Sequence, residues 1–160
     1  MKKFASLALA LGVAAIAFPR GTEAQETRNL NFGTVAPDQT PWADQLRDTQ
    51  ARIRRDSNGA IGVRVFLGGS MGSEVEIVED IAQGQRLQGG GISTAALAEG
   101  ANVPILMMPE LPYLFRNNAE ADAVLDDVLW EPVGAALAAK GFVLGCWGEN
   151  GWRNFATTGP

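Results

Sequence analysis

The sequence contains no histidine and a single cysteine, Cys146. One cysteine excludes a disulfide within the chain, and without histidine it argues against a zinc site. The missing histidine also removes the usual general base for a serine or cysteine nucleophile. Cys146 lies in the apolar run 142–147, where we expect a buried structural thiol. We therefore predict a protein that is not an enzyme and has no metal and no cofactor.

The chain also lacks an apolar run long enough to cross a bilayer, which takes about 20 residues. The uncharged stretch Phe4–Phe18 follows Lys2 and Lys3, and the small-residue site Thr22-Glu-Ala24 comes shortly after it. This order is typical of an export signal peptide. We expect residues 1–24 to be cleaved and the protein to be secreted to the periplasm. We do not expect it to be an integral membrane protein.

Basic residues are fewer than acidic ones, 13 against 18. Removing residues 1–24 leaves 10 basic and 17 acidic residues. The formal net charge then becomes −7, compared with −5 for the whole chain. An exported protein with this balance is a poor candidate for binding nucleic acid or anionic membrane surfaces. Residues 25–160 suit one domain of ordinary size, with no repeat or linker that divides them.

Hydrophobic periodicity predicts alternating strands and helices. The predicted strands are residues 29–35, 61–67, 87–92, 142–147 and 151–156. The predicted helices begin at Pro41 and at Ser73 and continue with residues 120–129 and 132–140. This order predicts an α/β layer structure with a mixed sheet and right-handed crossovers.

Capping residues define several helix ends. Thr40 can cap a helix that begins at Pro41, and the turn 57–59 ends it. Ser73 and Glu76 have the spacing of a capping box. Gly141 is placed to stop the last helix.

The glycine-rich loop 68–72 lies between a predicted strand and a helix start, where backbone amides could hold an anion. A phosphate loop needs a lysine followed by serine or threonine after its last glycine, and this pair is absent. The third glycine of a dinucleotide fingerprint is absent too. An ordinary turn is the simpler interpretation of these residues.

Two stretches carry a resemblance to a known family. They are Leu87-Gln-Gly-Gly-Gly-Ile-Ser-Thr-Ala-Ala-Leu97 and Leu111-Pro-Tyr-Leu-Phe-Arg116. Both resemble the substrate-binding proteins of TRAP (tripartite ATP-independent periplasmic) transporters, of the dicarboxylate-receptor type, with Tyr113 for the usual phenylalanine. The resemblance implies a type II periplasmic binding protein-like lobe. Residues 25–160 would then form the N-terminal portion of a solute-binding domain, without the family's second lobe and principal anchoring arginine.

The resemblance also implies ligand-contacting residues. Ser93 and Thr94 fall where such receptors place ligand contacts, although ordinary turn chemistry explains them as well. Glu74 would face the ligand cleft, or only favour the first helical turn through the helix dipole. Arg153 and Asn150 lie in a stretch dense in aromatic and polar groups. Arg153 could fork onto a carboxylate, or be a surface charge.

The function that follows is capture of a small organic acid anion for TRAP import. The expected partners are that ligand and the TRAP membrane permease subunits. Dicarboxylates, keto acids, sugar acids and polyols all remain open as ligands. The alternative is a truncated or split receptor remnant without tight ligand binding, or a sensory or structural partner.

Overall fold

The computed structural model describes residues 27–152, 156 and 158–159. The predicted signal peptide therefore lies outside the described residues. Strands and helices alternate in the first part of the chain and helices follow in the second. In order, they are β1 (Arg28–Thr34), α1 (Pro41–Asp56), β2 (Ile61–Phe66), α2 (Glu74–Gln83), β3 (Gly89–Gly91), α3 (Thr94–Gly100), the 3-10 helix η1 (Pro104–Glu110), α4 (Asn118–Ala123), the π-helix η2 (Val124–Leu129) and α5 (Trp130–Ala138).

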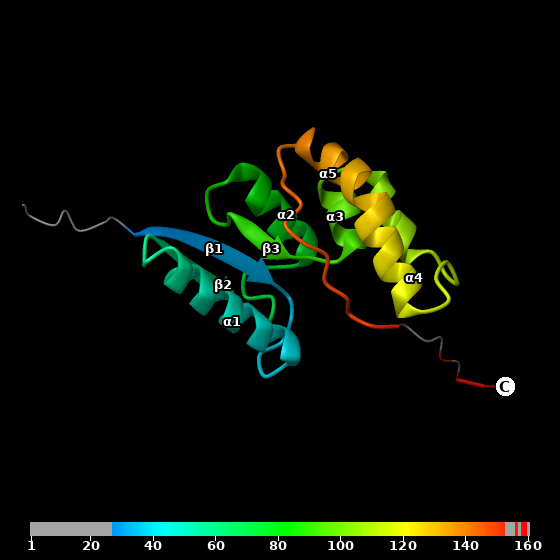
Figure 1. Cartoon of the computed structure of the whole chain (residues 1–160), viewed down its shortest axis with the longest axis horizontal. Coiled ribbons are helices and arrows are strands. Elements are labelled where there is room, and N and C mark those ends of the chain that lie inside the picture. The colour runs from blue at the N-terminus through cyan, green and yellow to red at the C-terminus, as the bar shows by residue number, and fades with distance from the viewer. Residues whose placement is uncertain (1–26, 153–155, 157, 160) are drawn as a thin grey trace, which may run out of the picture.

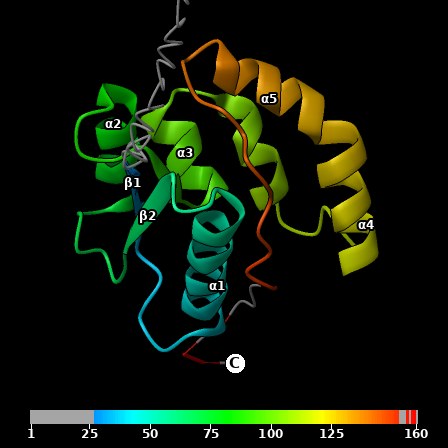
Figure 2. The ribbon, with the colours of Figure 1, turned by 60° about the vertical axis from the view of Figure 1, so that its left-hand side comes forward.

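The three strands form a sheet in the order β2-β1-β3, and both pairings are parallel. Helix α1 packs on one side of this sheet and α2 on the other, and α3 packs against α2 (Figures 1 and 2). The α/β layer structure is as predicted. The expected mixed sheet has no counterpart among the described residues, where every strand pair runs parallel.

The first two helices begin and end where their capping residues predict. The Thr40 hydroxyl accepts a hydrogen bond from the Ala43 N–H at 3.3 Å, and Pro41 is the first residue of α1. At α2, the Ser73 hydroxyl accepts from the Glu76 N–H at 3.3 Å. The Glu76 carboxylate accepts in return from the Ser73 N–H at 2.7 Å. The capping box is thus confirmed.

Strand β3 is shorter than predicted and consists of three glycines, Gly89–Gly91. Its backbone packs closely against its neighbours. A Cβ at Gly90 would lie 3.0 Å from the carbonyl oxygen of Gly33 and 3.1 Å from the side chain of Ile77. Small residues therefore bring β1, β3 and α2 together more closely than side chains would allow.

The predicted break between the two C-terminal helices is wrong, because α4, η2 and α5 follow one another without a break. Pro132 has no N–H to donate to the carbonyl four residues earlier, which normally interrupts a helix. Here the π-helical turn Val124–Leu129 lies directly before it and changes the hydrogen-bonding register. Gly141, at φ 83°, ends the helical run as predicted.

Residues 142–147, predicted to be a buried strand, have no regular structure. Phe142 and Leu144 pack against the core, whereas Val143 is 93% exposed. No described strand pairs with this segment, and its side chains are at most half-buried. Cys146 is exposed, and the expectation of a buried thiol is therefore wrong. In the predicted strand 151–156, Gly151 and Trp152 have no regular structure, and residues 153–155 lie outside the described residues.

The main core lies between α2, α3, η1 and the C-terminal helices. Its fully buried large side chains are Val78, Leu106, Leu129, Val133 and Leu137. Ile77 and Leu87 are also fully buried and meet Gly33 of β1. This packing fixes the strands and leaves their carboxyl ends at one edge. Within the described part of the chain, no helix has the length and apolar character that a membrane span requires.

Candidate functional site

The carboxyl ends of β1 and β3 lie side by side, with Thr34 paired to Gly91. The chain leaving β1 continues to α1 on one side of the sheet, and the chain leaving β3 continues to α3 on the other (Figures 1 and 2). In open α/β sheets, ligands bind in the crevice at such a switch point. We call this region the β1–β3 edge. It is the place where the fold predicts a ligand.

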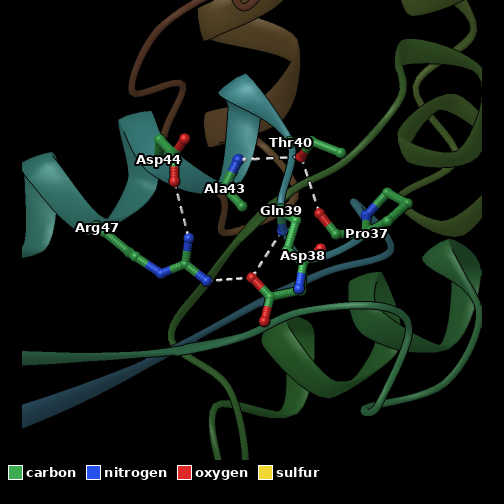
Figure 3. A network of polar contacts seen from close by, with 7 residues as sticks. All are labelled: Pro37, Asp38, Gln39, Thr40, Ala43, Asp44 and Arg47. Carbon is green, nitrogen blue, oxygen red and sulfur yellow. Dashed lines mark hydrogen bonds and ion pairs between the residues drawn. The ribbon is translucent and has the colours of Figure 1, made fainter.

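The loop after β1 is held by a polar network (Figure 3). The Arg47 guanidinium donates to the carboxylates of both Asp38 and Asp44, the latter at 2.9 Å. The pKa of Asp38 is lowered, first by this hydrogen bond from Arg47 and then by the N–H of Gln39. Because two carboxylates already surround it, the charge of Arg47 is largely compensated within the loop.

A second contact of this loop sets the start of α1. The Thr40 hydroxyl donates to the carbonyl oxygen of Pro37 at 2.8 Å while it accepts from Ala43 (Figure 3). The loop is thereby closed onto the helix N-terminus. The position of the next residues of α1, including Trp42, is fixed relative to β1.

Glu74 and Ser93, two of the residues proposed from the sequence, are in direct contact. The Ser93 N–H donates to Glu74 Oε1 at 2.8 Å, and the Ser93 hydroxyl donates to Glu74 Oε2 at 2.7 Å. The same hydroxyl accepts from the Ala96 N–H at 3.3 Å and caps α3. The hydroxyl proton of Ser93 is thus already donated within the protein.

Thr94 makes a similar contact with a different carboxylate. Its hydroxyl donates to Glu110 Oε1 at 2.6 Å. Two consecutive hydroxyls after β3 are therefore each bound by a glutamate, one at the start of α2 and one at the end of η1. These contacts hold the turn between β3 and α3 from two sides.

Trp42 is half-buried at the N-terminus of α1 and contacts two segments of the β1–β3 edge. A Cβ at Gly91 would lie 3.5 Å from its Nε1 and Cζ2 atoms, and a Cβ at Gly148 would lie 2.8 Å from its Cζ3 atom. Glycine at both positions lets the backbone approach the indole ring. Trp42 therefore joins the end of β3 to the C-terminal segment.

The structure does not bring all the residues proposed from the sequence together. Asn150 is exposed, and no described residue hydrogen-bonds to its side chain. Arg153 lies outside the described residues. Nearby, the Trp147 indole donates to the Leu125 carbonyl at 3.0 Å, and the Trp152 indole donates to Asn118 Oδ1 at 2.6 Å.

Sequence analysis missed two residues of this edge. Trp42 directly follows Pro41 at the predicted helix start, and no motif in the sequence marks it as a site residue. Glu110 precedes the Leu111–Arg116 motif and has no local pattern that links it to Thr94, 16 residues away. Only the packing of η1 against α3 brings that pair together.

A parallel α/β lobe with polar side chains at its switch point, as at the β1–β3 edge, is compatible with a solute receptor. A family model agrees: DctP, bacterial extracellular solute-binding protein family 7, matches residues 32–160. The chain belongs to this family. Its resemblance to TRAP transporter substrate-binding proteins is thereby confirmed, and so is the type II periplasmic binding protein-like fold.

Relatives with known names support the same family. The chain is 29% identical over 137 residues to a solute-binding protein of Verminephrobacter eiseniae, covering 84% of this chain and 39% of that protein. It is 23% identical over 154 residues to the 2,3-diketo-L-gulonate-binding periplasmic protein YiaO of Escherichia coli, covering 95% of this chain and 45% of YiaO.

Solved structures show the same fold. The sugar acid binding protein DctPAm of Advenella mimigardefordensis, in complex with galactonate, is 27% identical with a TM-score of 0.65, covering 72% of this chain and 36% of that one. A TRAP periplasmic solute-binding protein of Xanthobacter autotrophicus, with bound β-D-galacturonate, is 28% identical with a TM-score of 0.63, covering 70% and 37%.

The chain spans less than half the length of the relatives that it matches. The family consists of periplasmic solute-binding proteins of transport systems and is not an enzyme family.

Proposed function

We propose that this protein is the extracytoplasmic solute-binding component of a TRAP transporter. It would capture a small organic acid anion and deliver it to the membrane permease subunits. The family match over residues 32–160 carries the proposal. The polar β1–β3 edge supports it, because this edge is the switch point of an open α/β sheet, where ligands usually bind.

The ligands of the relatives suggest which acids to test first. Their names include galactonate, galacturonate and 2,3-diketo-L-gulonate, which are all sugar acids. A sugar acid combines one carboxylate with several hydroxyls. It therefore needs both a cationic group and hydrogen-bonding groups that surround it on several sides.

We assign the proposed site residues as follows. Arg153 binds the ligand carboxylate through two parallel hydrogen bonds, and Asn150 contributes an amide. Ser93 and Thr94 border the ligand from the end of β3. Because their hydroxyl protons are donated to Glu74 and Glu110, they offer the ligand only acceptor lone pairs.

Glu74 has two possible effects on such a site. Its carboxylate fixes Ser93, which keeps the turn after β3 in place. Its negative charge also disfavours a second carboxylate nearby. A ligand hydroxyl facing this side therefore suits Glu74 better than a ligand carboxylate does.

We also propose that residues 1–24 are a cleaved signal peptide and that residues 25–160 are the N-terminal portion of the solute-binding domain in the periplasm. The intact mass of the exported protein should correspond to a chain that begins at Gln25. Retention of residues 1–24 in a membrane-bound form would contradict this part of the proposal.

Binding is tested by thermal shift and calorimetry with D-galactonate and D-galacturonate. A ligand that binds only the folded state raises the melting temperature. Arg153→Lys keeps the charge but loses the planar fork and should weaken binding by roughly ten- to a hundredfold, about 1.5–3 kcal/mol.

The matched control is Arg55→Lys, because Arg55 is an exposed arginine that pairs only with the adjacent Asp56 among the described residues. It should leave affinity unchanged. If neither acid raises the melting temperature of the wild type, the proposal for sugar acids is wrong. If Arg153→Lys lowers unliganded stability but leaves affinity unchanged, Arg153 is a structural residue and not a ligand contact.

A further inference from the structure

We propose that Trp42 is a further ligand-binding residue at the β1–β3 edge. Its indole N–H donates a hydrogen bond to an oxygen of the bound acid, and its ring packs against the carbon skeleton. This inference rests on the proposed function, because it concerns the same edge of the sheet. It adds a residue that lies on α1, outside every motif found in the sequence.

The position of the indole N–H carries the first part of the argument. Nε1 and Cζ2 of Trp42 lie beside the backbone of Gly91, the last residue of β3. A Cβ at Gly91 would lie 3.5 Å from Thr34 Oγ1, at the end of β1, and also 3.5 Å from Trp42 Nε1. The nitrogen edge of the ring is therefore at the switch point itself.

The second part is that this donor is unused within the described residues. Trp147 and Trp152 both donate their indole N–H groups, to Leu125 and Asn118. Trp42 is half-buried, yet no described residue accepts from its Nε1. This Nε1 is not among the buried polar atoms without a partner in the described part of the chain, so its N–H faces solvent. A ligand oxygen at the switch point would replace water as the acceptor of that N–H.

The third part is that several side-chain donors near this edge are already paired within the protein. Ser93 donates to Glu74, Thr94 donates to Glu110, and Arg47 is bound by two aspartates. An indole can only donate. Trp42 therefore adds a donor for an oxygen-rich anion next to the Thr34 hydroxyl, which accepts from the Ala36 N–H.

The ring is also held before any ligand binds. Gly148 lets the C-terminal segment pass so close that a Cβ there would lie 2.8 Å from Cζ3. The hydrogen bonds of the Thr40 hydroxyl hold the backbone two residues before Trp42. A donor that is already in place loses little conformational freedom on binding, which favours affinity.

The test is Trp42→Phe, which keeps an aromatic ring and removes the N–H. The dissociation constants for D-galactonate and D-galacturonate should rise about three- to thirtyfold by calorimetry. The unliganded melting temperature should fall moderately, because a phenyl ring does not reach as far as the indole atoms that meet Gly148. Affinity is therefore measured at a temperature where both proteins are folded. The ligand-induced change in tryptophan fluorescence should also be lost.

Trp130→Phe is the matched control. Trp130 is 40% exposed at the start of α5, and its indole also has no acceptor among the described residues. This variant should bind both acids like the wild type and keep the fluorescence change.

Two outcomes would overturn the inference and leave the proposed function standing. One is wild-type affinity in Trp42→Phe. The other is an affinity loss matched by an equal loss in Trp130→Phe. If neither acid raises the melting temperature of the wild type, the sugar-acid part of the proposed function is wrong, and the role of Trp42 in binding these acids is overturned with it.

Discussion

The carboxylate of Glu74 accepts both hydrogen bonds that Ser93 can donate, one from its backbone N–H and one from its hydroxyl. The two residues are 19 positions apart in the chain. The contact joins the first residue of α2 to the turn that follows β3. It therefore couples the two segments that border the β1–β3 edge on one side.

We expect Glu74→Ala to destabilise the fold by about 1–3 kcal/mol, because it leaves two partly buried donors of Ser93 without an acceptor. The double variant Glu74→Ala/Ser93→Ala should lose less than the sum of the two single variants. Urea denaturation measures all three. Glu79→Ala, at an exposed glutamate of the same helix, is the control and should change stability by less than about 0.5 kcal/mol. Strict additivity of the two single variants would show that the contact contributes nothing.

Gly148→Ala tests the contact between the C-terminal segment and Trp42. The new methyl group would meet the indole ring, so either the ring or the segment must move, at a cost of about 1–3 kcal/mol. Gly145→Ala is the control in the same segment, because nothing lies within 4 Å of its Cβ position. It should be neutral or slightly stabilising. Equal melting temperatures for the two variants would mean that the Trp42 ring does not pack against Gly148 in solution.

The capping box of α2 predicts a pH dependence. The pKa of Glu76 lies below its ordinary value of 4.5, first because the Ser73 N–H donates to it and then because the Ser73 hydroxyl does. A lowered pKa in the folded state contributes stability above pH 4.5 that is lost as the pH falls through the folded value. The stability difference between the wild type and Glu76→Gln should therefore shrink in acid. Chemical denaturation between pH 3 and 7 measures it.

Ser73→Ala gives the second arm of that experiment. It removes the hydroxyl donor and keeps the N–H, so the pKa of Glu76 should move part of the way back toward 4.5. An NMR titration of the Glu76 side chain follows this directly. No movement would mean that the hydroxyl does not reach the carboxylate.

Cys146 should react with a maleimide in the native protein, without denaturant, because its side chain is exposed. Mass spectrometry should show one added group, and Cys146→Ser should show none. If labelling requires urea, the thiol is buried in solution, as the apolar run 142–147 first predicted.

Local chemistry was sufficient to predict the first half of the fold. Thr40, Pro41, Ser73 and Glu76 act on backbone groups within a few residues, so their sequence spacing already contains the geometry. The alternation in residues 29–35 and 61–67 predicted β1 and β2 for the same reason. The motifs around Ser93 and Leu111 led to the family, which the DctP match confirms.

Other features depend on neighbours that are distant in sequence. An apolar run such as 142–147 becomes a strand only where a partner strand is available, and none of the described strands pairs with it. The continuous helix through Pro132 depends on a π turn that no residue pattern announces. In both places, propensity was outweighed by packing.

The sequence by itself determined the helix caps, the glycine strand, the acidic charge and the family, because each depends on residue type and short spacing. Only the tertiary structure decided which polar groups at the β1–β3 edge are already paired. It joined Glu74 to Ser93 and Glu110 to Thr94, and it placed Trp42 between Gly91 and Gly148. Contacts across 16 to 106 residues arise from the packing of whole elements, and no local pattern encodes them.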